Sequence, residues 1–373
     1  MSYKIISIVG ARPQFVKSAM VSGALDKLHN ESLQHVMVHT GQHYDAHMSD
    51  IFFEQLGLKK PHFFLGIGSH SQGKQTGLML ESIEAVLMSQ RPDMVILYGD
   101  TNSTLAGALA ASKLHIPIVH VEAGMRSFNS LMAEEINRKI TDHLSSILFC
   151  SSAISVTHLL KEGIQHSNTA FPAVYEVGDV MLDALKIFEE KADRLSQSSS
   201  FQFKPKDYFL VTIHRAENVD DFKKLKTIIE TLDEIAADGY KLIFPVHPRT
   251  EKAMRTWNLN PSSQHFNFIK PVSYLEMVWL EKNACAVVTD SGGVQKEACF
   301  FNVPVLTLRD ETEWVETLEV GLNRLVPIER EKILEAFLER TRFHGVGSPF
   351  LAYGRGDSSQ KIASHLQDHL SLL

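Results

Sequence analysis

The short sequence Asp290, Ser291, Gly292, Gly293 combines residue types that can hold a phosphate group. It follows an apolar, strand-like run, 284–288, and precedes a helix-like stretch, 293–301. Two glycines at such a turn remove Cβ atoms where a phosphate could approach the backbone, and the start of the helix offers free N–H groups. Glu297 lies about one turn further on, where its carboxylate could accept a hydrogen bond from a sugar hydroxyl, and the strand-like run 303–308 ends at Arg309. The pattern favours a nucleotide diphosphate site, and the alternative is a glycine turn needed only for tight packing.

Three acidic residues follow strand-like runs or begin a helix in the first half of the chain. Asp100 follows the run 94–98, Glu122 follows 118–121, and Glu134 opens a helical stretch that also contains Arg138. Carboxylates that converge raise one another's pKa, which suits proton transfer. Asp100 could alternatively cap the next helix, and one acid of the pair at 134–135 could be a first-turn acid favoured by the helix dipole.

Basic and polar side chains occupy equivalent positions after other strands. Arg12 and Lys17 follow the first strand and could grip a phosphate, or else be a solvated helix start. The polar loop 39–45 fits sugar recognition but could equally cap the next helix. His214 and His247 each end a strand of the second half. No His/Cys/Asp spacing predicts a metal site, and no P-loop or Gly-x-Ser-x-Gly sequence occurs.

The elements that would position these residues form two βαβ series in tandem. Strand-like runs lie at 4–9, 35–39, 94–98, 118–121, 147–150, 208–213, 241–246, 266–269, 284–288 and 303–308, with helical stretches between them. We therefore predict an α/β protein with two Rossmann-like domains and parallel sheets facing a cleft, because ligands bind beyond the carboxyl ends of such strands. The predicted domains are 1–173, which carries the acids, and 174–355, in which 174–177 is a connecting strand.

Composition restricts the class of protein. The 373 residues exceed the usual size of one core, and a formal charge of −7 argues against a nucleic acid or an anionic membrane as partner. Cys150, Cys285 and Cys299 lie in or beside apolar stretches and are expected to be reduced, buried thiols. The first ten residues have no signal-peptide layout and no apolar run approaches about 18 residues, so we expect a cytoplasmic protein.

Eight motifs in order resemble the non-hydrolysing UDP-N-acetylglucosamine 2-epimerases, across about residues 4–365. They lie at 10–14 (GARPQ), 39–43 (HTGQH), 99–104 (GDTNST), 120–124 (HVEAG), 134–138 (EEINR), 212–215 (TIHR), 245–248 (PVHP) and 290–297 (DSGGVQKE). The resemblance implies a GT-B type fold in which a last helix, within 356–373, packs back on the first domain. It also implies a homodimer that supplies sugar nucleotides for surface polysaccharide.

The resemblance further implies a reaction and the residues that perform it. UDP is eliminated in an anti sense to give 2-acetamidoglucal, and it adds back with the proton on the other face of carbon 2. The family's catalytic residues match Asp100, Glu122, Glu134 and His214. The residues matched to substrate binding are Arg12, Lys17, Gln42, His43, Arg138, Arg215, His247, Tyr274, Ser291, Gly292, Gly293, Glu297 and Arg309. No oxidation occurs, so neither NAD nor another cofactor is implied, and no metal is.

Several positions depart from the commoner family sequence. Ala133 replaces a proline, Trp314 replaces an arginine, and Arg249 stands where asparagine is usual. These variants resemble the branch that includes epimerases of UDP-2,3-diacetamido-2,3-dideoxyglucuronate, in which Arg126 or Arg249 could contact the sugar carboxylate or could be plain ion-pair residues. A hydrolysing epimerase, a GT-B glycosyltransferase and a non-catalytic UDP-sugar sensor are the weaker alternatives.

Overall fold

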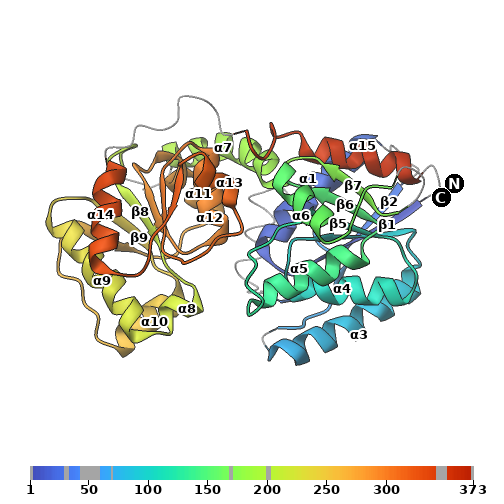
Figure 1. The fold of residues 1–373 in the computed structure, drawn as a ribbon, viewed down its shortest axis with the longest axis horizontal. Coiled ribbons are helices and arrows are strands. Elements are labelled where there is room, and N and C mark those ends of the chain that lie inside the picture. The colour runs from blue at the N-terminus through green and yellow to red at the C-terminus, as the bar shows by residue number, and fades with distance from the viewer. Residues whose placement is uncertain are drawn as a thin grey trace. The chain divides into compact units, whose positions relative to one another are not determined.

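The computed structural model describes residues 3–28, 33–42, 59–68, 70–167, 171–198, 203–341 and 351–370. The chain divides into two compact units (Figure 1). Unit 1 comprises Met1–Lys186 and Leu351–Leu373, and unit 2 comprises Ile187–Phe350. The predicted α/β class with two parallel sheets is confirmed, since each unit contains one of them.

Unit 1 is built on a seven-stranded parallel sheet with the order β3-β2-β1-β4-β5-β6-β7. Its strands are β1 (Tyr3–Val9), β2 (Leu33–His39), β3 (Phe63–Phe64), β4 (Met94–Tyr98), β5 (Ile118–Ala123), β6 (Ile147–Cys150) and β7 (Ala173–Glu176). Its helices are α1 (Arg12–Leu28), α3 (Gln72–Gln90), α4 (Asn102–Lys113), α5 (Ala133–Leu144), α6 (Ala153–Lys161) and α15 (Ser358–Leu370). Helices α3, α4 and α5 gather on one side of the sheet, and α1 and α15 lie on the other (Figure 1).

The chain order of this sheet explains where the candidate acids lie. It runs outward from β1 to β3 and then returns to β4 on the other side of β1, so β1, β4 and β5 are neighbours. The strand order reverses between β1 and β4, the kind of place where ligands bind beyond strand ends in open α/β sheets. Lys17 lies in α1 after β1, Asp100 in the turn after β4, and Glu122 at the end of β5.

Unit 2 contains a six-stranded parallel sheet with the order β10-β9-β8-β11-β12-β13. Its strands are β8 (Phe209–Thr212), β9 (Leu242–Pro245), β10 (Phe266–Ile269), β11 (Val287–Thr289), β12 (Val305–Thr307) and β13 (Asn323–Leu325). Its helices are α8 (Ala216–Val219), α9 (Phe222–Ala237), α10 (Pro248–Thr256), α11 (Tyr274–Asn283), α12 (Gly292–Phe300), α13 (Val315–Glu319) and α14 (Arg330–Thr341). One apolar core joins α9 and α14 to the sheet, which fixes the strand ends.

The division differs from the predicted boundary after residue 173. We expected 174–177 to be a connecting strand of the second domain, but β7 pairs in parallel with β6, with Ile147 opposite Ala173. Unit 1 therefore extends to Lys186, and the boundary falls inside α7 (Val180–Ser198). Helix α15 belongs to unit 1, where it contacts α1. Among the described residues, no helix has the length and apolar character to cross a membrane.

Candidate functional site

The turn after β4 presents Asp100 to a cation from α5. Gly99 has a φ of 61°, a left-handed value that favours glycine and lets the chain leave the strand abruptly. The guanidinium of Arg138 lies 2.6 Å from Asp100 Oδ2, and the Asp100 side chain is 34% exposed. Asn137 donates a hydrogen bond of 2.9 Å to the Asp100 carbonyl and so fixes the backbone as well. The turn holds a partly exposed carboxylate in a single orientation beside a cation.

Glu122 lies at an irregularity of β5. The register with β6 shifts between Val121 and Ala123, and the φ of Glu122 is 76°, which is strained for a residue with a side chain. Its carboxylate forms an ion pair with Lys17 from α1, and both side chains are largely buried. The structure thus brings Lys17 and Glu122 together at the strand ends where Asp100 also lies.

The two acids at the start of α5 have different environments. Glu135 is fully buried and accepts hydrogen bonds from the backbone N–H groups of Ser127 (2.9 Å) and Phe128 (3.2 Å). Burial opposes the charge, but the Ser127 N–H and the Arg138 guanidinium outweigh it, so the pKa of Glu135 lies below its ordinary value. Glu135 therefore holds the loop before α5, whereas Glu134 keeps an exposed side chain.

Gln42 is the last described residue of the polar loop after β2. Its side-chain oxygen accepts hydrogen bonds from Ser103 N (3.1 Å) and Ser103 Oγ (2.7 Å), so it caps the first turn of α4. The helix that Gln42 caps is α4, not the next helix along the chain, which was the alternative for this loop. The predicted substrate contact His43 lies outside the described residues, and so does the side chain of Arg12.

A buried charge cluster lies beneath the acidic turns, and it bears on the two alternatives for Arg126, a contact with a sugar carboxylate or a plain ion pair. Arg126 is only 1% exposed. Its guanidinium lies 2.7 Å from Asp142 and 2.6 Å from Glu162. His120 Nδ1 lies 2.6 Å from the other oxygen of Asp142. Arg126 is therefore paired with two carboxylates of its own chain, which supports the ion-pair alternative.

In unit 2, Asp290 organises the turn that carries His214. Asp290 is fully buried and accepts hydrogen bonds from His214 N (3.0 Å), Arg215 N (3.0 Å) and the Asn218 side chain (3.1 Å). The His214 ring is 39% exposed, and its Nδ1 lies 3.5 Å from Asp290 Oδ1. The His247 ring lies 5.6 Å from the His214 ring, centroid to centroid. A carboxylate that orients an exposed imidazole suits acid–base work by His214.

The start of α12 has the features of an anion site. Ser291 is the N-cap residue, and its hydroxyl accepts a hydrogen bond from Val294 N. A Cβ atom on Gly292 would lie 2.8 Å from a carboxylate oxygen of Glu313 and 3.8 Å from the Arg215 guanidinium, so a side chain here would require the Glu313 carboxylate to shift. Arg309 is buried and lies 3.2 Å from Glu313. A helix N-terminus flanked by arginine side chains attracts phosphate.

Three further residues of unit 2 singled out in the sequence, Tyr274, Trp314 and Arg249, each contact other residues of the chain. Tyr274 is the first residue of α11 and is buried behind the capping box of Ser273. The ammonium of Lys296 lies 3.7 Å from the ring centroid of Trp314, and both residues are buried, so the indole that replaces an arginine holds a cation of the same chain. Arg249 forms an ion pair with Asp220 at the surface, which supports the plain ion-pair alternative for this residue.

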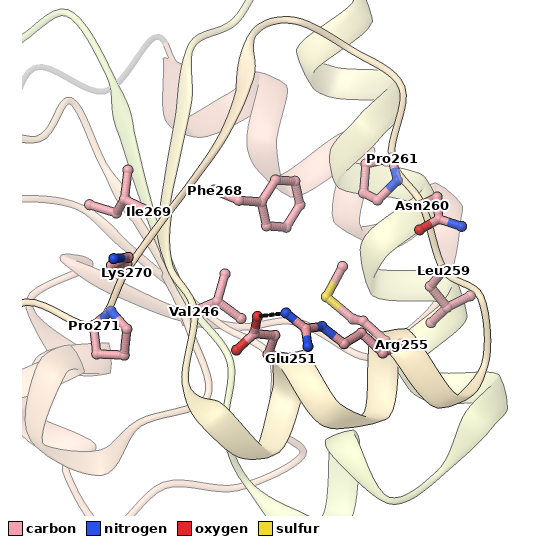
Figure 2. A pocket seen from close by; sticks show the side chains of 11 residues that line it. Val246, Glu251, Arg255, Leu259, Asn260, Pro261, Phe268, Ile269, Lys270 and Pro271 are labelled. Atoms are coloured by element: carbon pink, nitrogen blue, oxygen red, sulfur yellow. Dashed lines mark hydrogen bonds and ion pairs between the residues drawn. The ribbon is translucent and has the colours of Figure 1, made fainter.

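A separate pocket of about 430 Å³ lies beside α10 and β10 (Figure 2). It is lined by Val246, Glu251, Met254, Arg255, Leu259, Asn260, Pro261, Phe268, Ile269, Lys270 and Pro271. Glu251 and Arg255 form an ion pair of 2.6 Å at its edge. None of the residues predicted for the site lines this pocket. No cluster of His, Cys, Asp and Glu able to hold a metal ion occurs within the part of the chain that the structure describes.

Known proteins are similar to this chain over most of its length. A family profile described as UDP-N-acetylglucosamine 2-epimerase matches residues 26–367. The UDP-2,3-diacetamido-2,3-dideoxy-D-glucuronate 2-epimerase of Pseudomonas aeruginosa is 46% identical over 97% of this chain and 99% of its own length. The UDP-N-acetylglucosamine 2-epimerase of Methanocaldococcus jannaschii is 45% identical over 96% of this chain and 97% of its own length. The crystal structure of that enzyme with UDP-GlcNAc and UDP matches with a TM-score of 0.86 and 44% identity, covering 99% of this chain and 100% of the other.

Proposed function

The chain belongs to the UDP-N-acetylglucosamine 2-epimerase family and is therefore an isomerase, a UDP-sugar 2-epimerase. We propose that it interconverts UDP-N-acetylglucosamine and UDP-N-acetylmannosamine without net hydrolysis. The observation that carries this proposal is the pair of carboxylates at neighbouring strand ends, each held by a cation. Asp100 lies against Arg138 and Glu122 against Lys17. Epimerisation at one carbon needs proton transfer on two faces of the sugar, and two oriented carboxylates can supply it.

The chemistry needs no redox step. One group removes the proton from carbon 2, the bond between carbon 1 and the phosphate oxygen breaks, and UDP leaves with the electron pair. In the return step the UDP oxygen bonds to carbon 1 again, and a proton is delivered to the opposite face of carbon 2. We assign these proton transfers to a set comprising Asp100, Glu122, Glu134 and His214.

The negative charge that develops on UDP needs stabilisation by positive groups. We assign this role to the N-terminus of α12, with Ser291, Gly292 and Gly293, and to the side chains of Arg215 and Arg309. This assignment is supported by the arginine side chains that lie near the start of α12 in unit 2. In this proposal, the protein acts as a homodimer.

The second candidate substrate is UDP-2,3-diacetamido-2,3-dideoxyglucuronate, favoured by the 46% identity to the enzyme that is named for this sugar. The substrate carboxylate would need a cation. Arg126 cannot serve, because it is buried between Asp142 and Glu162. Arg249 would have to leave Asp220. Because both arginines are already paired with carboxylates of the chain, the second candidate is supported by sequence similarity more than by the structure.

Parallel turnover assays test the proposal. The purified protein is incubated with each of the two UDP-sugars, and the products are separated by anion-exchange chromatography. We expect UDP-N-acetylmannosamine to form from UDP-N-acetylglucosamine, with UDP remaining far below the sugar nucleotides. Steady release of UDP with free N-acetylmannosamine would contradict the non-hydrolysing assignment. Turnover of the glucuronate nucleotide alone would favour the second candidate.

A further inference from the structure

Glu135 is fully buried in the first turn of α5, and hydrogen-bond donors face both of its side-chain oxygens. Oε2 accepts hydrogen bonds from Ser127 N (2.9 Å), Ser127 Oγ (3.1 Å) and Arg138 Nε (3.2 Å), and Oε1 accepts one from Phe128 N (3.2 Å). A carboxylate has lone pairs for all of these donors, whereas a glutamine side chain would present an N–H donor in place of one acceptor. These surroundings therefore require an acidic side chain.

The Arg138 guanidinium links Glu135 to Asp100. Its Nε and Nη2 lie 3.2 Å and 3.0 Å from Glu135 Oε2, and its Nη1 lies 2.6 Å from Asp100 Oδ2. The Arg138 side chain is only 3% exposed, so the two acids hold it from two sides. A planar guanidinium presents its donors in a fixed fork. The position of Glu135 therefore determines the direction from which Arg138 meets Asp100.

Glu135 also holds the loop after β5 in an unfavourable backbone conformation. Phe128 has a φ of 60°, a left-handed value that costs free energy for a residue with a side chain, and the residue is 68% exposed. Its ring packs edge to face against that of His158, with 5.1 Å between the centroids. Such a conformation persists only where its surroundings enforce it. The hydrogen bonds from the N–H groups of Ser127 and Phe128 to Glu135 supply this restraint.

These contacts form a continuous chain from the loop to an acid assigned to proton transfer. Glu135 holds the loop backbone at 127–128 and the Arg138 guanidinium, and Arg138 holds Asp100, all within unit 1. We propose that Glu135 is a positioning residue that couples the 127–128 loop to Asp100 through Arg138. The effect of Glu135 on turnover rests on the proposed function, whereas the physical link between the three side chains does not.

Kinetics of E135Q in the full-length protein test the coupling. The amide group would face a donor that Glu135 now accepts from, so Arg138 should move, and a displacement of about 1 Å can lower turnover about 100-fold. We expect kcat to fall by about that factor, while KM and UDP binding by calorimetry stay close to wild type. K139M is the matched control, because Lys139 also lies 3.8 Å from Glu135 but is 42% exposed. K139M should leave kcat nearly unchanged.

R138K separates this coupling from a simple need for positive charge. Lysine keeps the charge, but one ammonium group cannot meet Glu135 and Asp100 with the fixed fork of a guanidinium. We expect R138K to lower kcat about as much as E135Q, and the double variant E135Q/R138K to be little slower than either, because both changes break one link. Losses that multiply in the double variant would overturn the proposal. Wild-type kcat in R138K would also overturn it, and that result decides the matter if E135Q does not fold.

A crystal structure of E135Q tests the link without turnover and separates the two proposals. We expect the Arg138 guanidinium to leave its 2.6 Å contact with Asp100, and an unchanged contact would overturn the coupling. Folded E135Q with wild-type kcat would also overturn the coupling and leave the proposed function intact. A wild-type protein that turns over neither UDP-sugar would overturn the proposed function, while the E135Q structure would still decide the link.

Discussion

Replacing Asp290 by alanine should destabilise unit 2 selectively. The carboxylate is fully buried and satisfies the backbone N–H groups of His214 and Arg215, whereas Asn218 keeps a second hydrogen bond to the Leu308 carbonyl. D290A therefore leaves two part-buried donors without their acceptor. A fully buried unpaired donor costs about 1–3 kcal/mol, so the free energy of unfolding of unit 2 should fall by up to roughly 6 kcal/mol. Asparagine at this position keeps one acceptor oxygen and should cost less.

Tryptophan fluorescence during urea unfolding measures this loss in one unit. The three tryptophans, Trp257, Trp279 and Trp314, all lie within Ile187–Phe350, so their emission reports unit 2. D220A is the matched control, because Asp220 is an exposed carboxylate of the same unit whose ion pair with Arg249 contributes little. A D290A transition within about 1 kcal/mol of wild type would show that the two N–H groups do not depend on Asp290.

Three further predictions concern the acids, the buried cluster and the C-terminal helix. E122Q removes a proton-transfer group and should lower kcat by about 100-fold or more, with UDP affinity by calorimetry nearly intact; retained activity would contradict the role of Glu122. R126M leaves Asp142 buried without its guanidinium and should lower the unfolding free energy by about 3–5 kcal/mol in chemical denaturation, and a neutral effect would count against the cluster. Desolvation lowers the pKa of His365 and His369 in α15, so these residues bind fewer protons in the folded state than in the unfolded state. The packing of α15 should therefore be most stable above about pH 6.5 and should weaken as the pH falls through the folded pKa values. Hydrogen exchange of the α15 amides should show this loss of protection, and protection that does not change with pH would refute it.

The sequence was sufficient for the fold class because strand and helix periodicities alternate along most of the chain. It could not assign the strand at 174–177 correctly, because a four-residue strand does not reveal its neighbour, and β7 completes the first sheet beside β6. The short strand β13 was not predicted, since Asn323–Leu325 has no apolar run of its own.

The candidate acids could be found from their positions after strands, but their partners could not. Arg126 pairs with residues 16 and 36 positions further along the chain, so nothing local distinguishes a buried ion-pair arginine from one that meets a ligand. Asp290 was noted only as part of a glycine turn, although it holds the His214 turn from 76 residues away. The one available signal was a carboxylate directly after an apolar strand, where burial without partners would be costly.

The origin of the proton on carbon 2 tests the central claim most directly. Purified protein is incubated with UDP-N-acetylglucosamine in deuterated water and followed by proton NMR to equilibrium. The account predicts that UDP-N-acetylmannosamine appears with deuterium at carbon 2, and that the remaining UDP-N-acetylglucosamine also gains deuterium there. Formation of UDP-N-acetylmannosamine that keeps the original proton at carbon 2 would contradict proton transfer through exchangeable carboxylates.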